Sequence, residues 1–126
     1  MRKLTFVGGV HPYDGKDLSK DKPIVSVLPK GELVYPVSQH IGAPASPIVK
    51  KGDRVLVGQK IAEQTGFVSA PVYASVSGTV KAIEPRRVVT GDSVMSIVVE
   101  NDNQYEEAPM QPPGPPESLS REQIID

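Results

Sequence analysis

The sequence contains no cysteine among its 126 residues. Disulfides, thiolate zinc sites, cysteine nucleophiles and cysteine-ligated iron–sulfur clusters all need thiol groups, so none of them can be built within this chain. Tryptophan is also absent, and two phenylalanines and four tyrosines are the only large aromatic residues. A core must therefore consist mainly of aliphatic side chains, and any redox centre must lie elsewhere.

The chain also lacks a strong net charge and any long apolar run. Fourteen Lys and Arg residues oppose fifteen Asp and Glu residues, for a formal net charge of -1. Such a balance gives no long-range attraction for nucleic acid or for an anionic membrane. The apolar N-terminal stretch is broken by Gly8 and Gly9, so it lacks the apolar region of a signal peptide, and no run is long enough to span a bilayer. We expect a cytoplasmic protein that binds no nucleic acid.

Turn-forming residues, in contrast, are abundant. Thirteen prolines and eleven glycines interrupt a chain in which 38% of the residues are hydrophobic. This composition favours an all-β fold with many turns and one modest core, because long helices do not tolerate frequent proline and glycine.

The centre of the chain, residues 39–84, contains two consecutive hairpin-like units. The first is built on Lys51-Gly52-Asp53 with Gly58-Gln59, and the second on Ser77-Gly78-Thr79. Glycine can take the positive φ of a tight turn, and valines flank both turns. The pattern is typical of a small β fold found in carrier domains and in modules of electron-transfer proteins.

Short strands are predicted on both sides of these turns. Ile24–Leu28 and Leu33–Val37 are expected to form strands separated by a turn at Pro29-Lys30-Gly31. Ser93–Glu100 is the strongest strand prediction, since β-branched residues dominate it and turn-formers bound it.

The composition divides the chain into four parts. Residues 1–23 are expected to be an arm that wraps the core, residues 24–104 the β domain, and residues 105–117 a proline-rich linker. Residues 118–126 resemble the start of a helix, with Ser120 and Gln123 at capping-box spacing. Because a helix of one or two turns is not stable alone, we expect the natural protein to continue beyond Asp126.

Several segments together resemble one family, the N-terminal region of the C subunit of the Rnf electron-transport complex, an ion-translocating ferredoxin:NAD oxidoreductase. The similarity covers most of residues 4–104, and its most specific pieces are GGVHP and QHIGAP. The matching segments are Phe6–Pro12, Ser38–Pro44, Val49–Asp53 with Gly58-Gln59, Gly66–Pro71, Ser77–Val80 and Val99–Asp102. Tyr73 stands where the family often has histidine, and Asn103 where an Asp-Gly turn is usual.

The resemblance implies a barrel-sandwich hybrid fold, similar to biotinyl and lipoyl carriers. It implies a structural or docking domain that is itself non-catalytic, within a subunit whose missing part binds NADH, FMN and 4Fe–4S clusters. The implied partners are other domains of this subunit and other Rnf subunits, with ferredoxin and NAD reached through the complex. The implied location is peripheral, on the cytoplasmic face of the membrane. No catalytic, cofactor-binding or metal-binding residue of the family can be transferred to this chain.

A carrier domain with a prosthetic group on lysine is the main alternative. Carriers of this fold present the lysine at an exposed hairpin tip, yet the connecting segment Gln64–Pro71 contains no lysine. Lys50 and Lys51 occupy a different turn, where solvated charge is the ordinary explanation. Attachment therefore remains the less favoured hypothesis.

The only two histidines, His11 and His40, do not form a metal cluster with nearby carboxylates in the sequence. A structural contact with the backbone is favoured for both. A Ser-His-Asp set could be assembled from Ser69 or Ser77 with His40 and Asp53, but no nucleophile elbow supports it. A third class, a hydrolase or sugar-phosphotransfer domain of similar topology, would need both histidines as an active pair.

Overall fold

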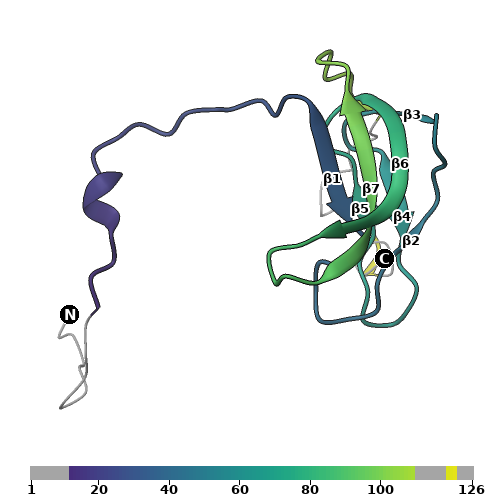
Figure 1. Cartoon of the computed structure of the whole chain (residues 1–126), viewed down its shortest axis with the longest axis horizontal. Helices are drawn as coiled ribbons and strands as arrows, with labels where there is room; N and C mark the ends of the chain where they lie inside the picture. Colours follow the sequence, from purple (N-terminus) through teal and green to yellow (C-terminus); the bar gives the residue numbers. More distant parts are fainter. Residues whose placement is uncertain (1–11, 110–118, 122–126) are drawn as a thin grey trace.

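A computed structural model describes residues 12–109 and 119–121, and within them the chain is almost entirely β (Figure 1). This confirms the predicted all-β class. Residues 12–31, the described part of the chain before the barrel, contain the short 3-10 helix η1 (Lys16–Leu18). The strands are β1 (Glu32–Pro36), β2 (Ser46–Pro47), β3 (Arg54–Val55), β4 (Lys60–Glu63), β5 (Val72–Tyr73), β6 (Gly78–Arg87) and β7 (Ser93–Asn101). No helix in these described ranges is long and apolar enough to cross a membrane.

The strands form two antiparallel sheets. One has the order β1-β7-β6-β3, and the other has the order β2-β4-β5. The long hairpin of β6 and β7 runs from the pair Gly78 and Asn101 to the pair Arg87 and Ser93. A register shift between Val80 and Ala82 marks a bulge, which increases the local twist of the hairpin. In Figure 1, β6 curves around one side of the barrel, as a bulged strand does.

The core is aliphatic, as the shortage of aromatic residues requires. Both sheets contribute fully buried side chains: Val55, Ile61, Val76, Val80, Ile97, Val98 and Val99. Each buried aliphatic side chain stabilises the fold by about 1.5–3 kcal/mol relative to an exposed one. Tyr35 is the buried aromatic residue of this cluster. Its hydroxyl oxygen lies 3.0 Å from Ser75 Oγ and accepts a hydrogen bond from the Ser75 backbone N–H.

Two of the predicted strands are confirmed and one is wrong. Leu33–Val37 corresponds to β1, and Ser93–Glu100 to β7. Ile24–Leu28 forms no strand, and the chain bends at Gly31, where φ is 75°, before β1 begins. The Pro29 carbonyl accepts hydrogen bonds from the Asn101 side chain (2.7 Å) and the Tyr105 hydroxyl (2.7 Å), and β1 pairs with β7 instead.

The structure describes the expected N-terminal arm, residues 1–23, from residue 12 onward. Residues 12–28 run outward from the barrel in Figure 1, and nearly all of their side chains are exposed. We call Ile24–Leu28 the apolar arm, since four of its five side chains are aliphatic. The side chains of an extended segment are buried only where the segment meets another surface. Pro23 and Pro29 flank this segment, and proline lacks a backbone N–H for strand pairing.

At the other end, the chain stays attached to the barrel within the segment whose composition predicts a linker. The Val57 N–H donates to the Glu106 carbonyl (2.9 Å), and the Ala108 N–H donates to the Val57 carbonyl (2.8 Å). Asn103 has a φ of 58°, in the left-handed region where glycine or asparagine is favoured. This backbone angle explains why asparagine can replace the Asp-Gly turn usual in the family. The predicted helix at 118–126 lies mostly outside the described residues.

Candidate functional site

Two loops meet at one end of the barrel and are joined by several hydrogen bonds. We call residues 38–44 the His40 loop and residues 64–71 the tip loop. Four hydrogen bonds join them: Ala43 N–H to the Val68 carbonyl (2.8 Å), Thr65 Oγ1 to the Pro44 carbonyl (2.7 Å), Ser69 Oγ to the Ala43 carbonyl (2.8 Å), and Ala70 N–H to His40 Nε2 (3.1 Å). The two segments therefore act as one structural unit.

Gly42 is required for this close approach. A β carbon at this position would overlap the Val68 carbonyl oxygen and would lie 2.7 Å from the Val68 carbonyl carbon. Only glycine, which lacks that atom, lets the two backbones come this close. The requirement at this turn is thus steric, and any side chain at residue 42 would push the loops apart.

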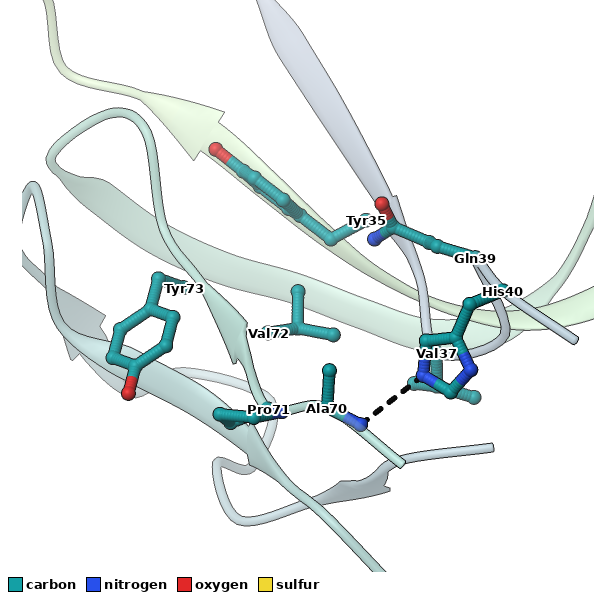
Figure 2. A pocket seen from close by; sticks show the side chains of 8 residues that line it. All are labelled: Tyr35, Val37, Gln39, His40, Ala70, Pro71, Val72 and Tyr73. Carbon is teal, nitrogen blue, oxygen red and sulfur yellow. Dashed lines mark hydrogen bonds between the residues drawn. The ribbon is translucent and has the colours of Figure 1, made fainter. Parts of the chain in front are cut away.

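The ring of His40 lies between the two loops, with a backbone N–H of each facing one of its nitrogens. Its Nδ1 faces the Gly42 N–H at 3.0 Å, and its Nε2 faces the Ala70 N–H at 3.1 Å, drawn in Figure 2. A neutral imidazole has one acceptor nitrogen, so the ring accepts from one of these two N–H groups at a time. The sequence predicted a structural contact with a backbone carbonyl, but the observed partners are backbone N–H groups. His11 lies outside the described residues.

A cavity of about 410 Å³ lies beside His40. Figure 2 shows Tyr73 at one side and His40 at the other, with Val72 and Pro71 between them and Val37 drawn at the His40 side. The lining contains no carboxylate, lysine or arginine. Within residues 12–109 and 119–121, no three His, Asp or Glu side chains gather as metal ligands would. The cavity is lined by apolar side chains together with the polar groups of Tyr35, Gln39, His40 and Tyr73.

A separate polar network fastens the C-terminal segment to the barrel. The buried Ser77 Oγ donates to Asp102 Oδ1 (2.6 Å) and accepts from the Glu106 N–H (3.0 Å). Arg54 forms ion pairs with Asp102 (3.0 Å) and Glu106 (2.7 Å). The hydrogen bond from Ser77, and next the backbone N–H of Gln104, lower the pKa of the Asp102 carboxyl below its usual range. The charged form of Asp102 thus stabilises the fold.

Acid is expected to weaken this network. A carboxyl whose pKa is lower in the folded chain contributes stability above pH about 4, and this contribution is lost as the pH falls through the folded value. Asp102→Asn should therefore lower the free energy of unfolding at pH 7 and reduce its further decrease at acidic pH. Urea unfolding at a series of pH values measures both effects. Glu107→Gln, on the same segment but outside these contacts, is the control, and equal acid dependence in Asp102→Asn and the unsubstituted chain would contradict the assignment.

The structure does not bring together the Ser-His-Asp set that could be assembled from the sequence. Ser77 bonds to Asp102, Ser69 to the Ala43 carbonyl, and Asp53 Oδ2 accepts from the Lys50 N–H within its own turn (2.7 Å). Lys50 and Lys51 lie on this turn, away from the tip loop. At the place where carriers present a lysine stands Phe67, with its side chain fully exposed.

Sequence reasoning missed the apolar surface of the two loops. It noted the missing lysine in the tip loop but drew nothing from Phe67. A usable signal was present, since residues 38–44 and 64–71 contain no Asp, Glu, Lys or Arg at all. Exposed loops normally carry charge, so a charge-free pair of loops indicates surface that is meant to be covered.

The two packed sheets, the connecting tip loop and the polar attachment of the C-terminal segment define a barrel-sandwich hybrid domain. Residues 4–104 match the family described as the RnfC barrel sandwich hybrid domain, and the chain belongs to this family. The resemblance inferred from GGVHP, QHIGAP and the two turn motifs is thereby confirmed.

The similar proteins are C subunits of ion-translocating oxidoreductase complexes. The chain is 50% identical over 98 residues to the C subunit of the Na(+)-translocating ferredoxin:NAD(+) oxidoreductase complex of Acetobacterium woodii, covering 78% of this chain and 22% of that protein. It is 45% identical over 102 residues to the proton-translocating counterpart of Clostridium ljungdahlii, covering 81% and 22%. It is 39% identical over 123 residues to the C subunit of the ion-translocating oxidoreductase complex of Vibrio cholerae, covering 96% and 16%. The chain thus spans about a fifth of the length of these relatives.

Proposed function

We propose that this chain is a non-catalytic docking domain of the C subunit of an Rnf-type ion-translocating ferredoxin:NAD oxidoreductase. In this role it holds neighbouring parts of the subunit or complex in place, while FMN, NADH and 4Fe–4S clusters are bound by the remainder of the subunit. The partners are the other domains of the subunit and other Rnf subunits, at the cytoplasmic face of the membrane. Support comes from the names of the relatives, which are all subunits of multi-subunit complexes.

The apolar arm is the observation that carries this proposal. Ile24, Val25 and Val27 are 103%, 72% and 82% exposed, and Leu28 is 61% exposed. Burying four such side chains is worth about 1.5–3 kcal/mol each, a strong driving force for association. Contiguous exposed apolar surface of this kind marks interaction sites in folded proteins. A segment that packs on nothing within the described part of its own domain is suited to packing on a neighbour.

The barrel is suited to fixing the positions of neighbouring domains, because the segments that enter and leave it are both hydrogen-bonded to it. Pro29 and Gly31 carbonyls bind the end of β7, and the Ser77 network binds the segment that follows β7. The arm and the C-terminal segment therefore leave the barrel from fixed points. A domain that holds redox domains at a set distance needs such fixed attachment points.

No observation favours the carrier alternative. The tip loop carries Phe67 instead of a lysine, and Lys50 and Lys51 lie in another turn. Expression with a biotin ligase or a lipoate ligase and measurement of the intact mass distinguishes the two functions. We expect an unmodified mass, and an added prosthetic group would favour the carrier.

The proposal expects the 126-residue chain to have no flavin or nicotinamide chemistry of its own. FMN should bind no more tightly than a Kd of about 1 mM, the level of non-specific contact, and NADH should not be oxidised by an artificial acceptor. Isothermal titration and absorbance at the NADH band measure both. Stoichiometric FMN binding, or NADH oxidation that rises with protein concentration, would contradict the proposal that this domain is non-catalytic.

A further inference from the structure

The two joined loops expose an apolar tip. Ile41 of the His40 loop is 103% exposed, and Phe67 and Val68 of the tip loop are 105% and 61% exposed. We call these three residues the apolar tip. Hydrogen bonds between Ala43 and Val68, and between Ala70 and His40, hold the two loops that carry these side chains together. The hairpin end that a carrier domain uses for its prosthetic arm here presents an aromatic side chain.

The backbone that presents Phe67 is held in place before any partner arrives. Ser69 Oγ accepts from the Thr65 N–H (3.3 Å) inside the tip loop and donates to the Ala43 carbonyl across to the other loop. Thr65 also donates to the Pro44 carbonyl, and Gly42 permits the close backbone contact at Val68. A surface group that is already ordered loses little conformational entropy on binding, which favours tight association. An exposed aromatic side chain on a cross-braced loop has the properties of an interface anchor.

The absence of charge around the apolar tip indicates the kind of interface. Residues 38–44 and 64–71 contain no acidic or basic side chain apart from His40. The polar network of Arg54, Asp102 and Glu106, in contrast, carries several charges on a different part of the barrel. Interface centres are depleted in charged residues, and permanent interfaces are more apolar than transient ones. The apolar tip therefore fits a permanent neighbour better than an exchanging partner that is steered by charge.

We propose that the apolar tip inserts into an apolar pocket on the part of the same C subunit that lies outside these 126 residues. This proposal rests on the proposed docking function and names the surface and the partner. The matched region is only 22% of the Acetobacterium woodii relative, so about four-fifths of such a subunit is available as a permanently linked neighbour. Because this neighbour is on the same polypeptide, its effective concentration is high, so a small anchored surface contributes more than it would between separate molecules.

Site-specific crosslinking in the complete C subunit within its complex tests the proposal. A photoreactive p-benzoylphenylalanine replaces Phe67, and a second variant has it at Lys51 on the other turn. After irradiation, we expect most crosslinked peptides from residue 67 to join a segment of the same polypeptide beyond residue 126, at no less than about ten times the Lys51 yield. Crosslinks to another subunit, crosslinks to a second copy seen as a doubled mass on a denaturing gel, or a yield equal to that of Lys51 would each overturn the proposal.

A pair of substitutions gives an independent readout. In the complete subunit, Phe67→Ser should increase the rate of limited proteolysis between this domain and the remainder about ten-fold, whereas Phe67→Leu should stay within about two-fold, because leucine still fills an apolar pocket. Equal rates for both variants would contradict the anchor. If Phe67→Ser has no effect while substitution of the apolar arm still weakens assembly, the inference about the tip fails and the docking function stands. If the chain itself binds FMN, the docking function fails whatever Phe67 does.

Discussion

Gly78→Ala is expected to destabilise the barrel by about 3 kcal/mol, at the upper end of the usual cost of overpacking. The added β carbon would overlap the Glu100 carbonyl oxygen, and it would lie 2.9 Å from the Glu100 carbonyl carbon and 3.2 Å from Asn101 Cα. All three atoms belong to the backbone of β7, so no side-chain rotation relieves the overlap. Gly78 pairs with Asn101 and is itself buried, so moving the strands apart would open the hairpin where it meets the Ser77 network.

Urea unfolding followed by circular dichroism measures this effect. Thr79→Ala is the matched control, since residue 79 is the exposed neighbour of Gly78 on the same strand, and it should change the free energy of unfolding by no more than about 0.5 kcal/mol. A Gly78→Ala chain as stable as the Thr79→Ala chain would show that β6 and β7 do not approach as closely as described.

Replacing the four aliphatic residues of the apolar arm by serine is expected to weaken association with the rest of the complex by at least about a hundred-fold. The residues are Ile24, Val25, Val27 and Leu28. Every 1.4 kcal/mol corresponds to a ten-fold change in affinity, and burial of even two of these side chains exceeds about 2.8 kcal/mol by the usual values. The same variant should unfold at the unsubstituted temperature, because the arm makes little contact with the barrel.

Copurification of the remaining subunits with the tagged complete subunit measures the association. A control variant with Lys20→Ser and Lys22→Ser changes the same exposed region without removing apolar surface, and it should copurify normally. Normal copurification of the fourfold serine variant would mean that the arm is not a contact surface.

The turns and the longest β-branched strand could be predicted because they depend on local chemistry. Gly52 has a φ of 95° in the turn that the KGD motif indicates, and β7 spans the segment with the most β-branched residues. The polar attachment through Ser77 and Asp102 could not be predicted, because residues 25 positions apart meet only after the sheets close.

The structure of Ile24–Leu28 and the exposure of Phe67 could not be predicted from local sequence. The arm has strand-forming residues, yet it does not pair with β1, the edge strand of its sheet, and strand propensity alone does not decide such pairing. For Phe67 the sequence established that no lysine stands at the tip, yet whether an aromatic side chain is buried depends on how two distant loops meet. The exposure of these side chains was therefore established only by the fold, although the lack of charge in the two loops was readable in the sequence.

The kinetic behaviour of the fourfold arm variant tests most directly whether this domain holds other parts of the complex in place and takes no part in the reaction itself. The four serines are introduced into the complete subunit, which is assayed for NADH oxidation with an artificial acceptor, and the assembled complex is assayed for ferredoxin-linked NAD turnover. Our account predicts NADH oxidation within about two-fold of the unsubstituted subunit and a loss of at least about ten-fold in the ferredoxin-linked reaction, in line with the lost contacts. A parallel fall in both activities, in a variant that has kept its cofactors, would contradict it.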